Sequence, residues 1–189
     1  MLVPVMIISI TGSTSNVGKT TLIEKMLQSL SGTWGVCKVT ICSPGRRHRC
    51  PHGKDETCGI CNENLSTFVA ETNKSVLRQT GKDTWRYYEA GAERVVWVRS
   101  REEALGEGIN AALDQMQDLT GIIFEGNHAL TVLEPDIAVM VLSTPLRYKA
   151  SAKNIRKKIG ISGEASDPEL LQRILRTVQE KEAPRQREL

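Results

Sequence analysis

The fold of this chain is decided by the segment Thr11-Gly12-Ser13-Thr14-Ser15-Asn16-Val17-Gly18-Lys19-Thr20-Thr21. Residues 3–10 before it form a short apolar run typical of a buried parallel strand, and residues 20–30 after it carry apolar side chains at helical spacing. A loop of small residues between a strand and a helix lets backbone N–H groups approach phosphate oxygens, and the positive end of the helix dipole adds to the attraction. The segment therefore predicts a nucleotide-binding loop.

Two side chains of this loop carry the chemistry that a bound nucleotide needs. Lys19 can reach the outer phosphates, and the Thr20 hydroxyl can bind Mg²⁺. The spacing differs by one residue from the common pattern Gly-x4-Gly-Lys-Ser/Thr, because Ser13 stands where the first glycine would be and Gly12 precedes it. We expect the stretch from Gly12 to Thr21 to surround the phosphates of GTP or ATP, with Lys19 also acting in catalysis.

The rest of the chain alternates further apolar strands with amphipathic helices. Strands are predicted over residues 35–42, 94–99, 120–124 and 136–142, and helices over residues 83–90, 101–117, 146–159 and 166–181. Such an alternation favours a mainly parallel sheet flanked by helices. We therefore expect one α/β domain over residues 1–189 with the three-layer fold of P-loop NTPases, interrupted by a cysteine-rich insert at residues 43–66.

The composition is that of an ordinary globular protein, with 40% hydrophobic and 25% charged residues and a net charge of +3. These values exclude collagen-like, disordered and coiled-coil classes. No apolar run approaches the roughly 20 residues that a membrane span needs. Residues 1–10 lack the basic leader and cleavage site of a signal peptide, so we expect a cytoplasmic protein without membrane contact. The net charge is too small to indicate nucleic-acid binding by itself.

The sequence resembles a known group of nucleotide-binding proteins. The phosphate loop is similar to that of dethiobiotin synthetase and the cobyrinate amidases. Segments 35–40, 81–92 and 122–126 resemble the molybdopterin-guanine dinucleotide biosynthesis protein B (MobB) family, although Val39 replaces a histidine of that family. The resemblance implies a GTP-binding, slowly hydrolysing accessory protein of molybdenum cofactor biosynthesis. It also implies a protein partner in cofactor maturation, and it leaves room for a homodimer.

Two acidic residues are candidates for holding and activating the nucleotide-bound Mg²⁺ beside Thr20. Glu125 ends a predicted strand and precedes a glycine, a position where carboxylates commonly bind such a metal. Asp83 follows a Gly-Lys pair at a predicted helix start, where it could instead be a simple helix cap. Lys38 lies within the second predicted strand and can reach the phosphates or an acidic substrate, because a buried lysine is costly unless it is paired.

The insert contains cysteines with the spacing of a metal site. The pattern C-x7-C-x7-C-x2-C is formed by Cys42, Cys50, Cys58 and Cys61, and the C-x2-C turn contains a glycine that suits two thiolates on one ion. Zinc and an iron–sulfur cluster are both open, as are cysteines that bind no metal, and His48 or His52 could replace one thiolate. The metal would either stabilise the fold of the insert or be an ion that the protein delivers elsewhere.

The sequence does not fix which base the bound nucleotide carries or which reaction the protein carries out. The guanine-reading motif Asn-Lys-x-Asp does not occur in the sequence. An ATP-dependent, carboxylate-activating enzyme like dethiobiotin synthetase and a nucleotide-driven metallochaperone are the alternative functions. Six basic residues and no acid lie between Ile137 and Gly163, and they form either a solvated face or a docking face for an anionic partner. They are Arg147, Lys149, Lys153, Arg156, Lys157 and Lys158.

Overall fold

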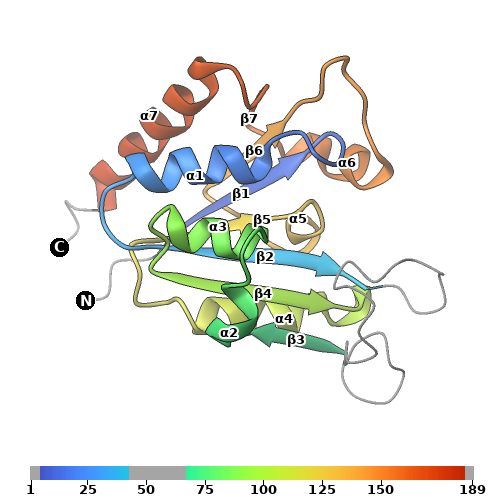
Figure 1. The fold of residues 1–189 in the computed structure, drawn as a ribbon. Coiled ribbons are helices and arrows are strands. Elements are labelled where there is room, and N and C mark those ends of the chain that lie inside the picture. The colour runs from blue at the N-terminus through green and yellow to red at the C-terminus, as the bar shows by residue number, and fades with distance from the viewer. Residues whose placement is uncertain (1–4, 43–66, 186–189) are drawn as a thin grey trace.

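The computed structural model describes residues 5–42 and 67–185, which form an α/β fold around a seven-stranded sheet (Figure 1). The strand order is β3-β4-β2-β5-β1-β6-β7, and every neighbouring pair is parallel except β3 with β4. The strands are β1 (Met6–Gly12), β2 (Trp34–Ile41), β3 (Phe68–Glu71), β4 (Arg94–Ser100), β5 (Gly121–Glu125), β6 (Ile137–Val141) and β7 (Ile161–Gly163). The predicted α/β class with a mainly parallel sheet is confirmed.

Helices cover both faces of the sheet because its central strands bury apolar side chains on both sides. One core is formed with α1, α3 and α7, a second with α4 and α5, and a smaller cluster joins α5 to α6 beside β6 (Figure 1). The helices are α1 (Lys19–Ser29), α2 (Lys74–Leu77), α3 (Asp83–Glu89), α4 (Leu105–Asp114), α5 (Ala129–Val132), α6 (Ala150–Ile155) and α7 (Pro168–Arg185). No helix in the described ranges is long and apolar enough to cross a bilayer.

The sequence prediction missed the shortest elements and made two helices too long, since the helix predicted over 101–117 is α4 over Leu105–Asp114. β3 and β7 have four and three residues, too few for an alternating pattern to stand out. The helix predicted over 146–159 begins only at Ala150, because the backbone of Lys149 is extended and its N–H donates to the Ser13 carbonyl instead of joining the helix. The predicted insert at 43–66 lies outside the described residues.

The sheet topology gathers the chemistry-bearing residues at one edge. β1, β2 and β5 run parallel, so their carboxyl ends meet where the loop between β1 and α1 begins. In this register Glu125 of β5 lies opposite Ile10 of β1 on one side and Lys38 of β2 on the other. The side chains of Glu125 and Lys38 thus flank the predicted phosphate loop. Open α/β sheets bind ligands at this edge.

Candidate functional site

The loop between β1 and α1 turns tightly before the helix begins. Asn16 and Gly18 have positive φ angles of 57° and 88°. A side chain at Gly18 would be strained at this angle and would also collide with Ala165, whose Cβ lies 2.6 Å from the position of an added Cβ. Among hydrogen bonds within the described residues, none comes from the N–H groups of residues 15–18, so these donors could bind an anion.

The start of the loop is fixed by Asn127, which follows β5. Its side-chain oxygen accepts a hydrogen bond from the Gly12 N–H, and its Nδ2 donates to the Gly12 carbonyl, both at 2.9 Å. Nδ2 also lies 3.3 Å from Ser151 Oγ at the start of α6. Because the Asn127 side chain is buried and engaged with backbone, its role is to position the loop and not to bind a substrate.

Lys19 and Glu125 form an ion pair at the centre of the site. Lys19 Nζ lies 3.2 Å from Glu125 Oε1, and the Tyr87 hydroxyl donates to Glu125 Oε2 at 2.7 Å. Glu125 is only 6% exposed and Tyr87 is fully buried. Burial, together with the negative charge and hydrogen bond of Glu125, raises the pKa of Tyr87 well above its ordinary value. Both oxygens of the Glu125 carboxylate are therefore held by α1 and α3.

Asp83 links Thr20 to Lys38. The Thr20 hydroxyl donates to Asp83 Oδ1 at 3.2 Å, and Lys38 forms an ion pair with Asp83 Oδ2. Burial acts to raise the pKa of Asp83, but the hydrogen bond and charge of Lys38 and the bond from Thr20 outweigh it and lower this pKa. Asp83 is the first residue of α3, and its carboxylate points to the loop side chains, so it is not a simple helix cap.

Helix α3 holds these contacts together, and Asp83 is the one residue of α3 that the sequence predicts to do so. Arg86 of α3 binds both carboxylate oxygens of Glu24 on α1, from Nε at 2.7 Å and from Nη2 at 2.6 Å. Its Nη2 also lies 3.3 Å from the Thr21 hydroxyl. Residues three and four positions apart lie on the same face of a helix, so α3 directs Asp83, Arg86 and Tyr87 towards the start of α1. Helical spacing from Asp83 was the signal that could have identified the other two.

The residues from 143 to 149 pack against the beginning of the phosphate loop. The Ser143 N–H donates to Ser13 Oγ at 2.9 Å, and the Lys149 N–H donates to the Ser13 carbonyl at 2.8 Å. Lys149 is half-buried, whereas Lys153 and Lys157 are exposed. Burial, followed by the nearby positive charge of Lys19, lowers the pKa of Lys149, and the charge of Glu125 opposes this. The prediction that Lys149 shares an exposed basic face with Lys153 and Lys157 is therefore wrong for Lys149.

The thiolate site stays a prediction because most of it lies outside the described residues. The residues that lie outside the described ranges are Cys50, Cys58 and Cys61, together with His48 and His52. Cys42 follows β2 directly and is buried. In the described ranges, no three histidine, cysteine or acidic residues come together in a way that could hold a metal. Cys37 is buried in the core of the α4 face, as a structural cysteine would be, and burial raises its pKa.

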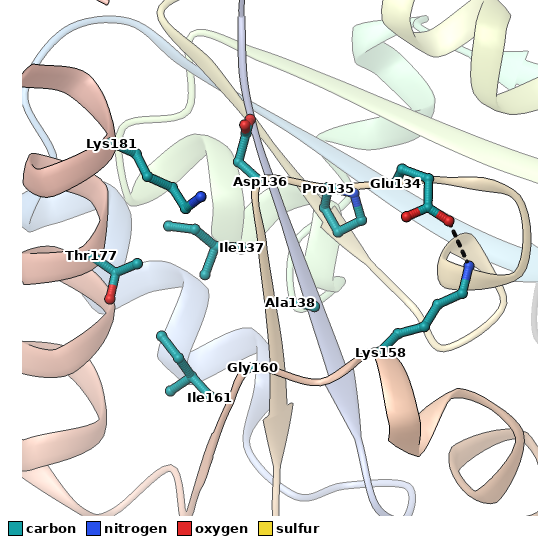
Figure 2. A pocket seen from close by; sticks show the side chains of 10 residues that line it. All are labelled: Glu134, Pro135, Asp136, Ile137, Ala138, Lys158, Gly160, Ile161, Thr177 and Lys181. Atoms are coloured by element: carbon teal, nitrogen blue, oxygen red, sulfur yellow. Dashed lines mark hydrogen bonds and ion pairs between the residues drawn. The ribbon is translucent and has the colours of Figure 1, made fainter. Parts of the chain in front are cut away.

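A separate cavity of about 460 Å³ lies at the opposite edge of the sheet, where β6 and β7 begin (Figure 2). Lys158 and Glu134 form an ion pair on one side of it, with a distance of 3.0 Å between Nζ and Oε1. Asp136 accepts a hydrogen bond from the Ile7 N–H at 2.8 Å and so joins β6 to β1. Since all the predicted nucleotide ligands lie at the other edge, this cavity does not belong to the candidate site.

The donor set at the phosphate loop fits a magnesium–nucleotide complex. Mg²⁺ prefers oxygen ligands, and the Thr20 hydroxyl and the carboxylates of Asp83 and Glu125 supply them within one cluster. Lys19 is paired with Glu125 and Lys38 with Asp83, and both lysines could supply positive charge for phosphate oxygens. Comparison of the chain with protein-family models, curated proteins and solved structures found no match.

Proposed function

We propose that this chain is a P-loop NTPase that binds a magnesium-bound nucleoside triphosphate, GTP or ATP, at residues 12–21. The observation that carries the proposal is the pair of lysine–carboxylate contacts, Lys19 with Glu125 and Lys38 with Asp83, beside a strand–loop–helix turn. Lys19 at the start of α1 and Lys38 on β2 are both half-buried, so each needs negative charge nearby. When the carboxylates of Glu125 and Asp83 bind a metal ion, the phosphates of a nucleotide supply that negative charge to the lysines instead.

The chain's own residues have distinct roles in this proposal. Loop N–H groups and Lys19 bind the phosphates, and Lys38 neutralises the outer one from the side of β2. Thr20 binds the metal directly, and Asp83 and Glu125 hold it or orient the attacking water. Bound Mg²⁺ supplies charge stabilisation to the phosphoryl group during transfer. Tyr87 positions Glu125 and does not itself touch the nucleotide.

The physiological role that we propose is that of an accessory protein in molybdenum cofactor maturation. The similarity of segments 35–40, 81–92 and 122–126 to the MobB family supports it. In this role turnover by the isolated protein is slow, because it acts on the substrate or product of a guanylyltransferase partner. The exposed residues Lys153 and Lys157 supply positive charge for that partner, so reversing both charges weakens association most at low salt.

Nucleotide binding is tested by comparing two lysine substitutions on the same helix. Lys19→Ala removes the cation that lies beside Glu125, whereas Lys25→Ala removes an exposed charge on α1 with no ion pair in the described residues. Titration calorimetry with Mg-GTP and with Mg-ATP measures both variants and the parent. We expect Lys19→Ala to lose at least about tenfold in affinity, since a hydrogen bond to a charged group contributes about 1.5–3 kcal/mol. Equal affinities in all three proteins would exclude the phosphate-loop assignment.

A further inference from the structure

The segment from Ser143 to Lys149 is fastened to the first residues of the phosphate loop at both of its ends. The Ser143 N–H binds the Ser13 side chain, and the Lys149 N–H binds the Ser13 carbonyl. A third contact, from Asn127 to Ser151, joins the start of α6 to the residue that also holds Gly12. Figure 1 shows α6 beside the loop that connects β1 to α1. The backbone of Lys149 is therefore positioned by the phosphate loop itself.

Lys149 differs in burial from the next basic residue along α6. It is half-buried, whereas Lys153, one helical turn later, is exposed. The positive charge of Lys19 and the negative charge of Glu125 both act on the pKa of its ammonium group, so the central ion pair of the site lies within electrostatic range of Lys149. Among the ion pairs formed within the described residues, none includes Lys149.

The positive charges of Lys19 and Lys149 are not balanced by the single negative charge of Glu125, so an additional anion would stabilise this part of the site. Lys19 already pairs with Glu125 Oε1, and the other oxygen of that carboxylate accepts the Tyr87 hydroxyl. The ammonium groups of Lys19 and Lys149 thus both lie within electrostatic range of one carboxylate, and both oxygens of that carboxylate already have partners. A like charge within a half-buried site is unfavourable unless a further negative group compensates it. In the proposed function Lys19 binds the phosphates, so the outermost phosphate of a triphosphate would be such a group.

We propose that Lys149 is a ligand of the outermost phosphate and makes the site prefer nucleoside triphosphates over diphosphates. This inference rests on the proposed nucleotide-binding function and adds to it a residue outside the phosphate-loop motif. A diphosphate lacks the group that Lys149 contacts, so only triphosphate binding gains from this cation. Lys149 would also stabilise negative charge on the phosphoryl group as it leaves.

The experiment measures the dissociation constants of four nucleotides in the presence of Mg²⁺. They are the β,γ-imido analogues of GTP and ATP, which are not hydrolysed, and GDP and ADP. The variants are Lys149→Ala and Lys149→Met, with Lys149→Arg as the charge-retaining variant and Lys153→Ala as the exposed control. The bond to Ser13 uses the Lys149 backbone N–H, so it is retained in all of them. Circular dichroism checks that each variant is folded.

We expect Lys149→Ala and Lys149→Met to weaken triphosphate binding about tenfold or more, and diphosphate binding less than about twofold. Lys149→Arg and Lys153→Ala should keep the parent's ratio of the two affinities. An unchanged ratio in Lys149→Ala and Lys149→Met, whether both affinities fall together or neither falls, overturns the inference while leaving nucleotide binding intact. A parent protein that binds none of the four nucleotides overturns the proposed function itself.

A second readout does not depend on any substitution. Limited acetylation by an N-hydroxysuccinimide ester, followed by peptide mass spectrometry, reports the accessibility of each lysine. The triphosphate analogue should protect Lys149 several-fold more than the diphosphate does, whereas Lys153 should react equally in both samples. Equal labelling of Lys149 with both ligands contradicts the contact.

Discussion

The hydrogen bond between Tyr87 and Glu125 gives the most direct test of how the site is assembled. Tyr87→Phe removes only the hydroxyl, which donates to Glu125 Oε2 at 2.7 Å. Tyr87 is fully buried and Glu125 is 6% exposed, so water does not readily replace the lost donor. A hydrogen bond to a charged group contributes about 1.5–3 kcal/mol to stability. With a urea dependence of about 2 kcal/mol/M, a loss of about 2 kcal/mol lowers the unfolding midpoint by about 1 M.

Urea unfolding of a double-mutant cycle isolates this pair from other effects. The cycle uses Tyr87→Phe, Glu125→Met and the combined variant, because methionine keeps the length of the side chain without its charge. The unpaired Lys19 is common to both Glu125 variants, so its cost cancels. We expect a coupling energy of about 1.5–3 kcal/mol. A coupling below about 0.5 kcal/mol would show that the two side chains do not stabilise each other, and that Tyr87 does not position Glu125.

The same bond predicts a pH dependence with a definite sign. Burial and Glu125 raise the pKa of Tyr87 in the folded protein above 10.0, the value of an unperturbed tyrosine. Protonated Tyr87 therefore stabilises the folded state below pH 10, and this contribution is lost as the pH rises above 10 and the unfolded chain ionises. The stability advantage of the parent over Tyr87→Phe should shrink above pH 10. An advantage that grows there would contradict the burial of the hydroxyl.

Three further predictions concern the metal ligands and the insert. Glu125→Gln should reduce hydrolysis about 100- to 1000-fold with little effect on nucleotide affinity, because Lys19 and the loop still hold the phosphates; unchanged turnover would transfer the metal role to Asp83. Without nucleotide and Mg²⁺, Asp83→Asn should destabilise the fold at neutral pH. The difference in stability from the parent should vanish as the pH falls through the lowered pKa of Asp83. Urea unfolding at several pH values measures this difference. Elemental analysis of anaerobically purified protein should find about one zinc ion or iron–sulfur cluster per chain; no stoichiometric metal would exclude a thiolate site at residues 42–61.

Much of the fold could be predicted because its signals are local. The apolar runs that become β1, β2, β4, β5 and β6 are short and bounded by turns, and the helices between them have a clear helical period. The weaker elements were missed for the same reason. β7 has three residues and pairs only with β6, so its strand conformation is set by its neighbour and not by its own sequence.

The candidate site was predictable to the extent that it follows from a general rule about parallel sheets. Carboxyl ends of parallel strands meet at one edge, which correctly brings Glu125 and Lys38 next to the loop that holds Lys19. The rule does not say which charge pairs with which. Only the packing of α3 against α1 joins Asp83 to Lys38 and Thr20, and leaves Glu125 to Lys19.

The strand–loop–helix segment around residues 12–21, the α/β class and the charged residues at the strand ends could be read from the sequence, because each depends on side chains within a few positions of one another. The tertiary structure alone decided the strand order, the positioning of Glu125 by Tyr87, and the place of Lys149 beside the loop. Helical spacing made Lys149 look like a neighbour of Lys153 on an exposed face. A single backbone hydrogen bond, from the Lys149 N–H to the Ser13 carbonyl, instead places the Lys149 backbone against the loop between β1 and α1.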